Sequence, residues 1–222
     1  LFNRIETGIV VKNYIGANFV DFYDFYEHWS AYDLEHAIRN EMPDGPWVTG
    51  SYMVRSMDGH DKLHGIILAL DEIQMVMSEL LIWFNAVPPW LRYLEQATHV
   101  LTSLPMIGRF VAYEIVTDLR HTHLLKQSRD ILTWANPGPG ARRGINRIFG
   151  HSLKALVSDE YANECMLDLL EESYDLCAKW GWDDFEMRDI EHCLCETDKY
   201  LRVKNGEGRP RAKNKWRNSF NG

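Results

Sequence analysis

Two glycine-bearing turns carry the residue types best suited to chemistry in this sequence. The first runs from Leu104 to Gly108 and is followed by an arginine, and the second runs from Asn136 to Gly144 and contains two arginines. Each turn opens a stretch with helical periodicity, so several backbone N–H groups point outward at a helix start, where the helix dipole favours an anion. Two such turns close together predict a ligand that contains phosphates.

Three arginines gather at the second turn. Arg143 and Arg147 lie four residues apart and share a helix face, and Arg142 is angled beside them. A glycine-rich turn with a guanidinium fork is what a departing phosphate or diphosphate requires. We expect the three side chains to bind one polyanion, and the structural alternative is a helix cap with solvated arginines.

The overall charge limits the kinds of partner. The formal net charge is −8, whereas general nucleic-acid binders are usually strongly basic. Positive charge is concentrated at the second turn and in a C-terminal run where Glu207 is the one acidic residue. We expect a local patch that docks DNA, and the C-terminal run either follows a phosphate backbone or is a solvated terminus. The basic residues of that run are Arg202, Lys204, Arg209, Arg211, Lys213, Lys215 and Arg217.

Helical periodicity extends over nearly the whole chain, and no segment alternates as a strand does. Ser158 and Gly181 are expected to cap the two ends of one helix, and Asp183 or Asp184 the start of the next. The sequence predicts a single all-α domain of about eight helices over residues 1–203 and a basic tail over residues 204–222. The longer helices are expected at Leu63–Ile82, Leu91–Leu104, Phe110–Leu119, Ile145–Leu156, Tyr161–Trp180 and Met187–Leu201.

Neither a metal centre nor a membrane span is expected. His192, Cys193 and Cys195 cannot readily chelate one ion, because residues two apart on a helix point to different faces. The longest apolar stretch, Ile66 to Val87, is interrupted by charged residues, and no basic, apolar leader follows Leu1. We therefore expect a cytoplasmic protein with reduced thiols. Its four cysteines are Cys165, Cys177, Cys193 and Cys195.

The first turn resembles a known DNA-binding element. The hairpin Leu104-Pro105-Met106-Ile107-Gly108, between two helical stretches, is similar to the helix-hairpin-helix element of base-excision DNA glycosylases, although Met106 stands where that family usually has glycine. In that family the hairpin amides hold a DNA phosphate, which implies backbone contacts for Ile107, Gly108 and Arg109. The resemblance also implies a helix-hairpin-helix glycosylase-like fold.

The second turn departs from the glycosylases. Their catalytic aspartate lies about two dozen residues after the hairpin, at the start of another helix. Here Asp130 is present, but the helix start has become a Gly-Pro-Gly loop followed by paired arginines. An aspartate stabilises a sugar cation when a glycosidic bond breaks, whereas a glycine turn and guanidinium groups suit a departing diphosphate. The sequence therefore favours chemistry other than base excision.

Three strings give a more specific resemblance. VAYEIVTDLRHT, TWANPGPGARRGINR and RDIEHCLCETDKYLR with GEGRPR look like the α-glutamyl/putrescinyl thymine pyrophosphorylases, or amino acid:DNA transferases, of phage DNA base hypermodification. The resemblance covers the chain from about Trp47 onward. It implies that an amine or amino acid displaces diphosphate from a pyrophosphorylated 5-hydroxymethyluracil in double-stranded DNA. The protein would then act in the cytoplasm of the host cell.

That reaction implies roles for particular residues. Asp118 and His121 are the first candidates to deprotonate the amine, and Glu191 and Glu196 the second. Asp118 is equally suited to capping a turn or to pairing with Arg120. No metal is required, although Mg²⁺ often accompanies a diphosphate. The resemblance further implies diphosphate binding by Gly138, Gly140, Arg142 and Arg143, base binding by Tyr113, Trp134 and Asn136, and backbone contacts by Arg147, Lys199 and Arg202.

Several of these residues also have a purely structural interpretation. The stripe on the helix from Met187 that contains Glu191, Lys199 and Arg202 is typical of a solvated face with internal ion pairs, and Tyr113 and Trp134 suit a core.

Three hypotheses therefore remain open. The first is the diphosphate-releasing transferase, and the second is a divergent glycosylase that uses Asp130 or Asp118. The third is a catalytically idle DNA-binding or scaffolding helical domain, for instance a helical companion of the 5-hydroxymethyluracil kinase, whose helical region shows a related pattern.

Overall fold

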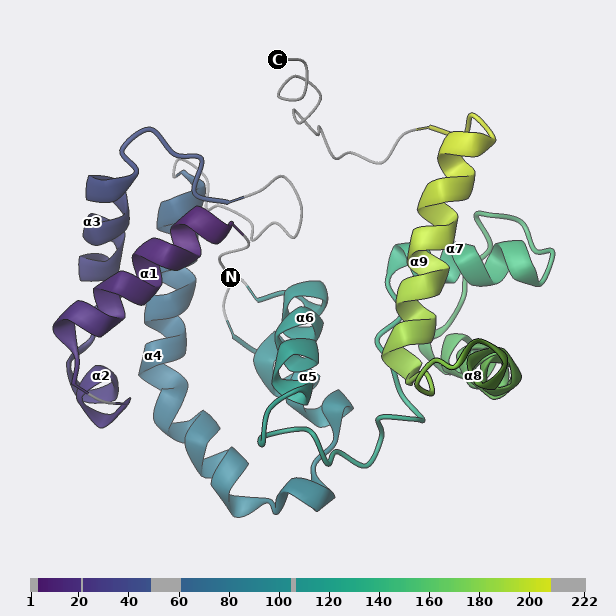
Figure 1. Ribbon diagram of the computed structural model, residues 1–222, viewed down its shortest axis with the longest axis horizontal. Helices are drawn as coiled ribbons and strands as arrows, with labels where there is room; N and C mark the ends of the chain where they lie inside the picture. The colour runs from purple at the N-terminus through teal and green to yellow at the C-terminus, as the bar shows by residue number, and fades with distance from the viewer. Residues whose placement is uncertain (1–3, 21, 49–60, 105–106, 209–222) are drawn as a thin grey trace. The chain divides into compact units, whose positions relative to one another are not determined.

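The computed structural model describes residues 4–20, 22–48, 61–104 and 107–208, all of them helix, turn or loop. Within these ranges the chain forms nine α-helices and one short 3-10 helix, and no strand (Figure 1). The prediction of an all-α protein is confirmed. Residues 209–222 of the expected basic tail, together with Pro105 and Met106 of the hairpin, lie outside the described residues.

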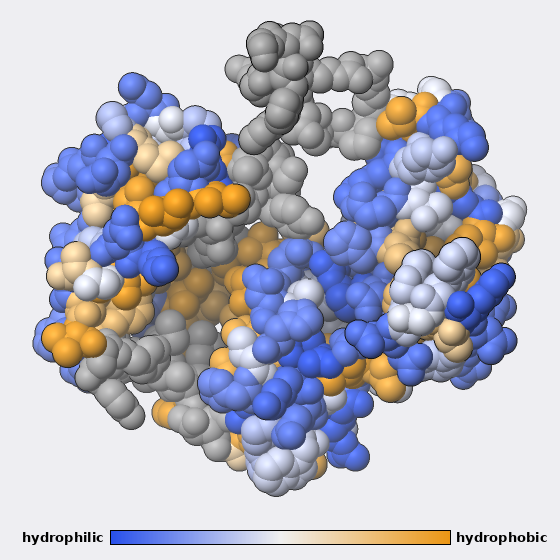
Figure 2. All heavy atoms as spheres, in the orientation of Figure 1, coloured by the Kyte–Doolittle hydropathy of each residue, from blue (hydrophilic) through white to orange (hydrophobic). Residues whose placement is uncertain are grey.

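The helices group into two compact units. The first unit contains α1 (Ile5–Asn18), α2 (Phe22–His28), α3 (Ala31–Glu41) and most of α4 (Lys62–Ala86). Helix α1 packs on α3, and a core forms around residues such as Trp29, Ile38 and Leu63. Apolar residues remain exposed along α1, where Figure 2 shows an orange band.

The second unit holds η1 (Pro89–Leu91), α5 (Leu94–Thr102), most of α6 (Arg109–Arg120), α7 (Pro139–Ile148), α8 (Asp159–Trp180) and α9 (Met187–Lys204). Helix α9 lies across α7, and α8 packs against both (Figure 1). Their shared core includes Ile145, Met166 and Leu194. The single domain expected over residues 1–203, and the separate tail after it, stay predictions.

The ends of α8 are as predicted. The Ser158 hydroxyl accepts a hydrogen bond from the Tyr161 N–H at the first turn, and Gly181 closes the helix in the left-handed conformation at φ 67°. Both signals are local, since a side-chain oxygen satisfies an amide of the first turn and glycine tolerates positive φ. Sequence alone was therefore sufficient for this element.

Three predicted boundaries were wrong. Helix α9 is capped by Glu186, not by Asp183 or Asp184, because Glu186 and Asp189 form a reciprocal capping box. Helix α7 begins at Pro139, whose fixed φ suits a first helical position, and has ended before Gly150 at φ 69°, so the helix predicted over Ile145–Leu156 does not form. Leu156, which fitted the helical period, is fully exposed in a loop.

The third boundary is the start of α5. This helix begins at Leu94 rather than Leu91, after the 3-10 turn at Pro89–Leu91. The Asp130 carboxylate accepts hydrogen bonds from the Leu94 N–H at 2.7 Å and the Glu95 N–H at 3.0 Å. The helix is thus capped by a side chain that is distant in sequence, and no pattern near Leu94 predicts this cap.

Candidate functional site

The glycines of the second turn line a close contact between α7 and α9. A Cβ atom at Gly144 would lie 2.6 Å from the carbonyl oxygen of Leu194, and one at Gly140 would lie 2.5 Å from the Sγ atom of Cys195. Gly140 and Gly144 are four residues apart and so share one face of α7. Their absent side chains let two helix backbones approach each other, which is a packing role.

The anion site expected at the start of α7 contains an internal carboxylate. Gly138 caps the helix, and its N–H donates to Oε1 of Glu191 over 3.4 Å. Glu191 is 6% exposed, and burial raises its pKa, although the Arg188 guanidinium and the Gly138 N–H oppose that shift. A carboxyl group supplied by α9 therefore already occupies the helix start.

Arg188 is the centre of a partly buried polar cluster with Glu191. Its guanidinium donates to Glu191 at 2.7 Å and to Glu114 of α6 at 2.9 Å, and it lies over the Tyr113 ring with its Cζ atom 5.0 Å from the centroid. One cation is therefore shared by two carboxylates and an aromatic face. This arrangement joins α6, α9 and the start of α7 within the second unit.

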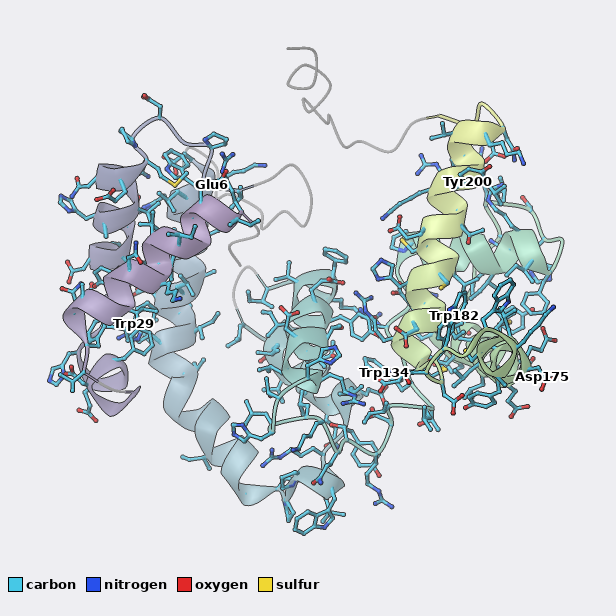
Figure 3. All side chains as sticks on the ribbon, in the orientation of Figure 1. Glu6, Trp29, Trp134, Asp175, Trp182 and Tyr200 are labelled. Carbon is cyan, nitrogen blue, oxygen red and sulfur yellow. The ribbon has the colours of Figure 1, made fainter. Side chains whose placement is uncertain are left out.

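The three residues predicted to bind the base lie beside this cluster. Tyr113 is 3% exposed and packs edge-to-face on Trp134, with ring centroids 5.5 Å apart (Figure 3). The Tyr113 hydroxyl lies near the Asn136 backbone but makes no hydrogen bond of normal geometry, and burial raises its pKa. Because the Arg188 guanidinium covers the Tyr113 ring, Tyr113 could contact a base only if the Arg188 side chain moved away. The base-binding role stays a prediction.

All three arginines of the second turn make internal contacts. Arg142 bonds to the Val157 carbonyl and the Asp159 carboxylate, and its Nε donates to the Pro137 carbonyl at 3.1 Å, which holds the start of α7 to the start of α8. These contacts satisfy the guanidinium without a bound polyanion.

Arg143 and Arg147 share carboxylate partners on α9 and just after it. Their Nε atoms lie 3.3 and 2.9 Å from Oδ1 of Asp198, which is 1% exposed, and both approach Glu207. The paired Arg147 lowers the pKa of Glu207 to about 2. The Arg143 and Arg147 guanidinium groups thus come together as a clamp would, but they bind Asp198 of α9 and Glu207, which follows that helix.

The other predicted proton acceptors are dispersed. Asp118 and His121 are exposed near the end of α6, joined by a hydrogen bond from the His121 N–H to the Asp118 carbonyl. Glu196 is exposed on α9 between Lys199 and His192. Of the four candidates, only Glu191 is buried among other ionisable groups.

The other residues predicted to contact a DNA backbone lie in two separate parts of the chain. Ile107 is buried and Gly108 and Arg109 are exposed at the start of α6, while Lys199 and Arg202 are half-buried on α9. The Ile107 N–H donates to the Leu104 carbonyl, which closes part of the predicted hairpin turn. Contact with a DNA backbone stays a prediction for these residues and for Arg147.

Sequence reasoning missed a basic surface segment, residues 119–129, here called the basic turn. It contains no carboxylate, and its His121, His123, Lys126 and Arg129 are exposed. The turn is fixed at its end, because the Arg129 N–H donates to the Arg92 carbonyl and the adjacent Asp130 caps α5. A run without acidic residues, in a chain of net charge −8, was the signal available in the sequence.

Three general features complete the description. In the described ranges no group of three or more His, Cys, Asp or Glu side chains is placed to hold a metal ion. No helix in the same ranges is long and apolar enough to cross a membrane. The four cysteines are free thiols, with Cys165 and Cys177 buried. A magnesium ion with a phosphate ligand stays a prediction.

Comparison with known proteins finds a similarity to a DNA kinase of a phage. A curated "5-hmdU DNA kinase" of Bacillus phage SP10 is 28% identical over 122 residues, which are 49% of this chain and 18% of that protein. The match thus spans less than a fifth of the relative's length. No solved structure gives a significant match, so the likeness to helix-hairpin-helix glycosylases stays a prediction.

These matches correct the assignment to the amino acid:DNA transferases. The resemblance pointed to the wrong enzyme, because the family that matches nearly the whole chain is a kinase family. Displacement of diphosphate by an amine is therefore not supported, while phosphate binding by Gly138, Gly140, Arg142 and Arg143 stays a prediction. The third hypothesis, a helical companion of the kinase, is the one supported.

Asp130, one of the two aspartates named in the glycosylase hypothesis, caps α5 with both carboxylate oxygens. Residues 1–209 match the family described as 5-hmdU DNA kinase, helical domain, and the chain therefore belongs to that family.

Proposed function

We propose that this chain is the DNA-binding helical part of an enzyme that phosphorylates 5-hydroxymethyluracil in DNA. The observation that carries the proposal is the match of residues 1–209 to the helical domain of such kinases. The sequence contains no glycine–lysine pair, which a Walker-type phosphate loop requires. We therefore assign to these residues contact with the DNA substrate, and phosphoryl transfer to another part of the enzyme.

The basic turn is the described surface best suited to a DNA backbone. Lys126 and Arg129 are exposed there, and Arg129 lies 5.9 Å from the centroid of the Tyr93 ring, which restrains its side chain. Cations held on a restrained segment gain phosphate contacts at a lower cost in conformational entropy. The arginines of α7 are less suited, because their guanidinium groups already bond to carboxylates and carbonyls.

The substrate itself does not demand base extrusion for recognition. The hydroxymethyl group stands at C5, where thymine carries its methyl group in the major groove. A helical surface held on the backbone therefore has access to this group in intact duplex DNA. The domain would present the hydroxyl oxygen that receives the phosphoryl group.

The proposal is tested by fluorescence anisotropy with two duplexes that differ only in one 5-hydroxymethyluracil in place of thymine. We expect binding to both, with tighter binding to the modified duplex. The double variant Lys126→Gln, Arg129→Gln should weaken both equally and reduce the slope of log K against log salt by about 1.8, from two lost phosphate contacts at about 0.9 each.

The matched control is Lys154→Gln, an exposed lysine in the loop between α7 and α8. Its Kd should be close to that of the unaltered chain. Equal affinity for the two duplexes would contradict recognition of the modified base, and an unchanged salt slope in the double variant would exclude the basic turn as the backbone contact.

A further inference from the structure

The turn between α8 and α9 carries an exposed ladder of one cation and three aromatic rings, here called the tryptophan ladder. Lys179 Nζ lies 5.9 Å from the Trp180 ring centroid, and the Trp180 and Trp182 centroids are 6.3 Å apart with planes at 24°. Trp182 and Phe185 follow at 6.3 Å and 13°. Trp180 is 60% and Trp182 54% exposed, so the two largest rings are accessible to solvent.

Local structure fixes this ladder in place. Gly181 adopts the left-handed conformation between the two tryptophans, and both the Gly181 and the Trp182 N–H donate to the Cys177 carbonyl, the latter at 2.9 Å. Phe185 packs against the core of the second unit and anchors the inner end. Rings ordered before binding lose little conformational entropy on contact, which is typical of the anchor residues of protein interfaces.

The charge around the ladder is strongly negative. Helix α8 has seven acidic residues and one basic residue, Lys179. Asp183 and Asp184, which follow Trp182, are exposed as well. This field repels the phosphates of a nucleic acid and attracts a cationic surface. The exposed carboxylates of α8 are Glu160, Glu164, Asp168, Glu171, Glu172 and Asp175.

We propose that the tryptophan ladder docks an arginine-bearing, cationic surface of a partner protein. A planar guanidinium stacks on an exposed indole face, and the Lys179 ammonium group already lies over the Trp180 ring. Asp175, Asp183 and Asp184 supply the negative charge that attracts the guanidinium. The incoming arginine displaces Lys179 from Trp180. This surface is separate from the basic turn, so its role does not depend on how the domain binds DNA.

The probe for this proposal is a nona-arginine peptide, titrated into the full chain by isothermal calorimetry, with nona-lysine of equal charge as its counterpart. We expect nona-arginine to bind more tightly, because guanidinium groups stack on indole rings better than ammonium groups. The double variant Trp180→Ala, Trp182→Ala should weaken nona-arginine binding about tenfold, from the loss of two cation–π contacts.

Trp90→Ala is the matched control, since Trp90 is 61% exposed on η1 and outside the ladder. It should leave the Kd for nona-arginine unchanged. Equal affinity for the two peptides, or an equal loss in the Trp90 variant, would overturn the stacking role of the ladder.

Three further measurements separate other occupants of the surface. Replacing the basic residues of the tail with glutamine should leave the affinity for nona-arginine unchanged. Tighter peptide binding in that variant would show that the tail occupies the ladder in the unaltered chain. Loss of DNA binding in the double tryptophan variant would indicate a nucleic-acid surface. Sedimentation that shows a dimer abolished by the same variant would indicate a second copy. The tail residues are Arg209, Arg211, Lys213, Lys215 and Arg217.

Discussion

The contact between α7 and α9 and the outer face of α8 belong to the same unit but use charge in opposite ways. At the α7–α9 contact, arginines and carboxylates pair with one another around glycines that admit close backbone approach. On α8, carboxylates and the tryptophan ladder remain exposed. Residues that look like ligand-binding groups are thus used for internal structure, and a face without any motif is the one left open to a partner.

The largest effect is expected when the α7–α9 contact is forced apart. Gly144→Ala should lower the free energy of unfolding by about 3 kcal/mol, because the new methyl group meets the backbone of Leu194, which cannot move aside as a side chain can. The gain in helix propensity, about 1 kcal/mol, opposes this and is smaller. Urea denaturation of the full chain measures the difference.

Gly8→Ala is the control for propensity, since Gly8 lies in α1 with no atom within 4 Å of an added Cβ. That variant should be as stable as the unaltered chain or more so, by up to about 1 kcal/mol. A Gly144 variant that gained stability like the Gly8 variant would mean that α7 and α9 do not pack as described.

A smaller loss is expected from the ion pairs at the same contact. Asp198→Ala should destabilise the chain by about 2 kcal/mol, because it leaves Arg143 and Arg147 without their buried partner, while solvent and Glu207 compensate in part. Thermal and urea unfolding measure this cost. Glu171→Ala, at an exposed position on α8, should change stability by less than about 0.5 kcal/mol. Equal losses of stability in Asp198→Ala and Glu171→Ala would contradict the distinction between the α7–α9 contact and the outer face of α8.

The pH dependence of stability should have opposite signs at two glutamates. Burial raises the pKa of Glu191 above 4.5, so the folded state keeps its proton to higher pH than the unfolded state. The stability of the unaltered chain relative to Glu191→Gln is then highest below the unfolded pKa and falls as pH rises through the folded one. Urea melts between about pH 3 and pH 7 follow this difference.

Glu207 serves as the opposite case. Its pKa is lowered to about 2 by Arg147, so its contribution relative to Glu207→Gln is present above the unfolded pKa and is lost as pH falls towards 2. Parallel pH profiles for the two variants would contradict the description of Glu191 as the buried carboxylate.

The smallest effect on stability is expected at the tryptophan ladder. Trp180→Ala should cost no more than about 1 kcal/mol, because the ring is largely exposed and loses one stacked neighbour and one cation. The same substitution should have its main effect on peptide binding. A loss of stability as large as that of Gly144→Ala would make the ladder a structural element instead.

The candidate site shows where sequence reasoning was sufficient and where it was not. The positions of Gly138 and Arg143 were recognised as special from their types and spacing, and Glu191 from the reaction that the family resemblance implied. Their partners were not, because Glu191 and Asp198 reach α7 from a helix about fifty residues away, and pairing over that separation depends on how the helices cross. No functional role was predicted for Trp180 and Trp182, since a hydrophobic pattern does not say which aromatic rings stay exposed.

The sequence by itself determined the all-α class and the two ends of α8, because helical periodicity, the Ser158 cap and the left-handed Gly181 act within a few residues. Only the tertiary structure decided that Gly140 and Gly144 admit a neighbouring helix, that the arginines of α7 are satisfied by α9 and α8, and that the acidic α8 ends in exposed tryptophans. Burial and pairing depend on which surfaces meet, and that information is not contained in any one segment of the chain.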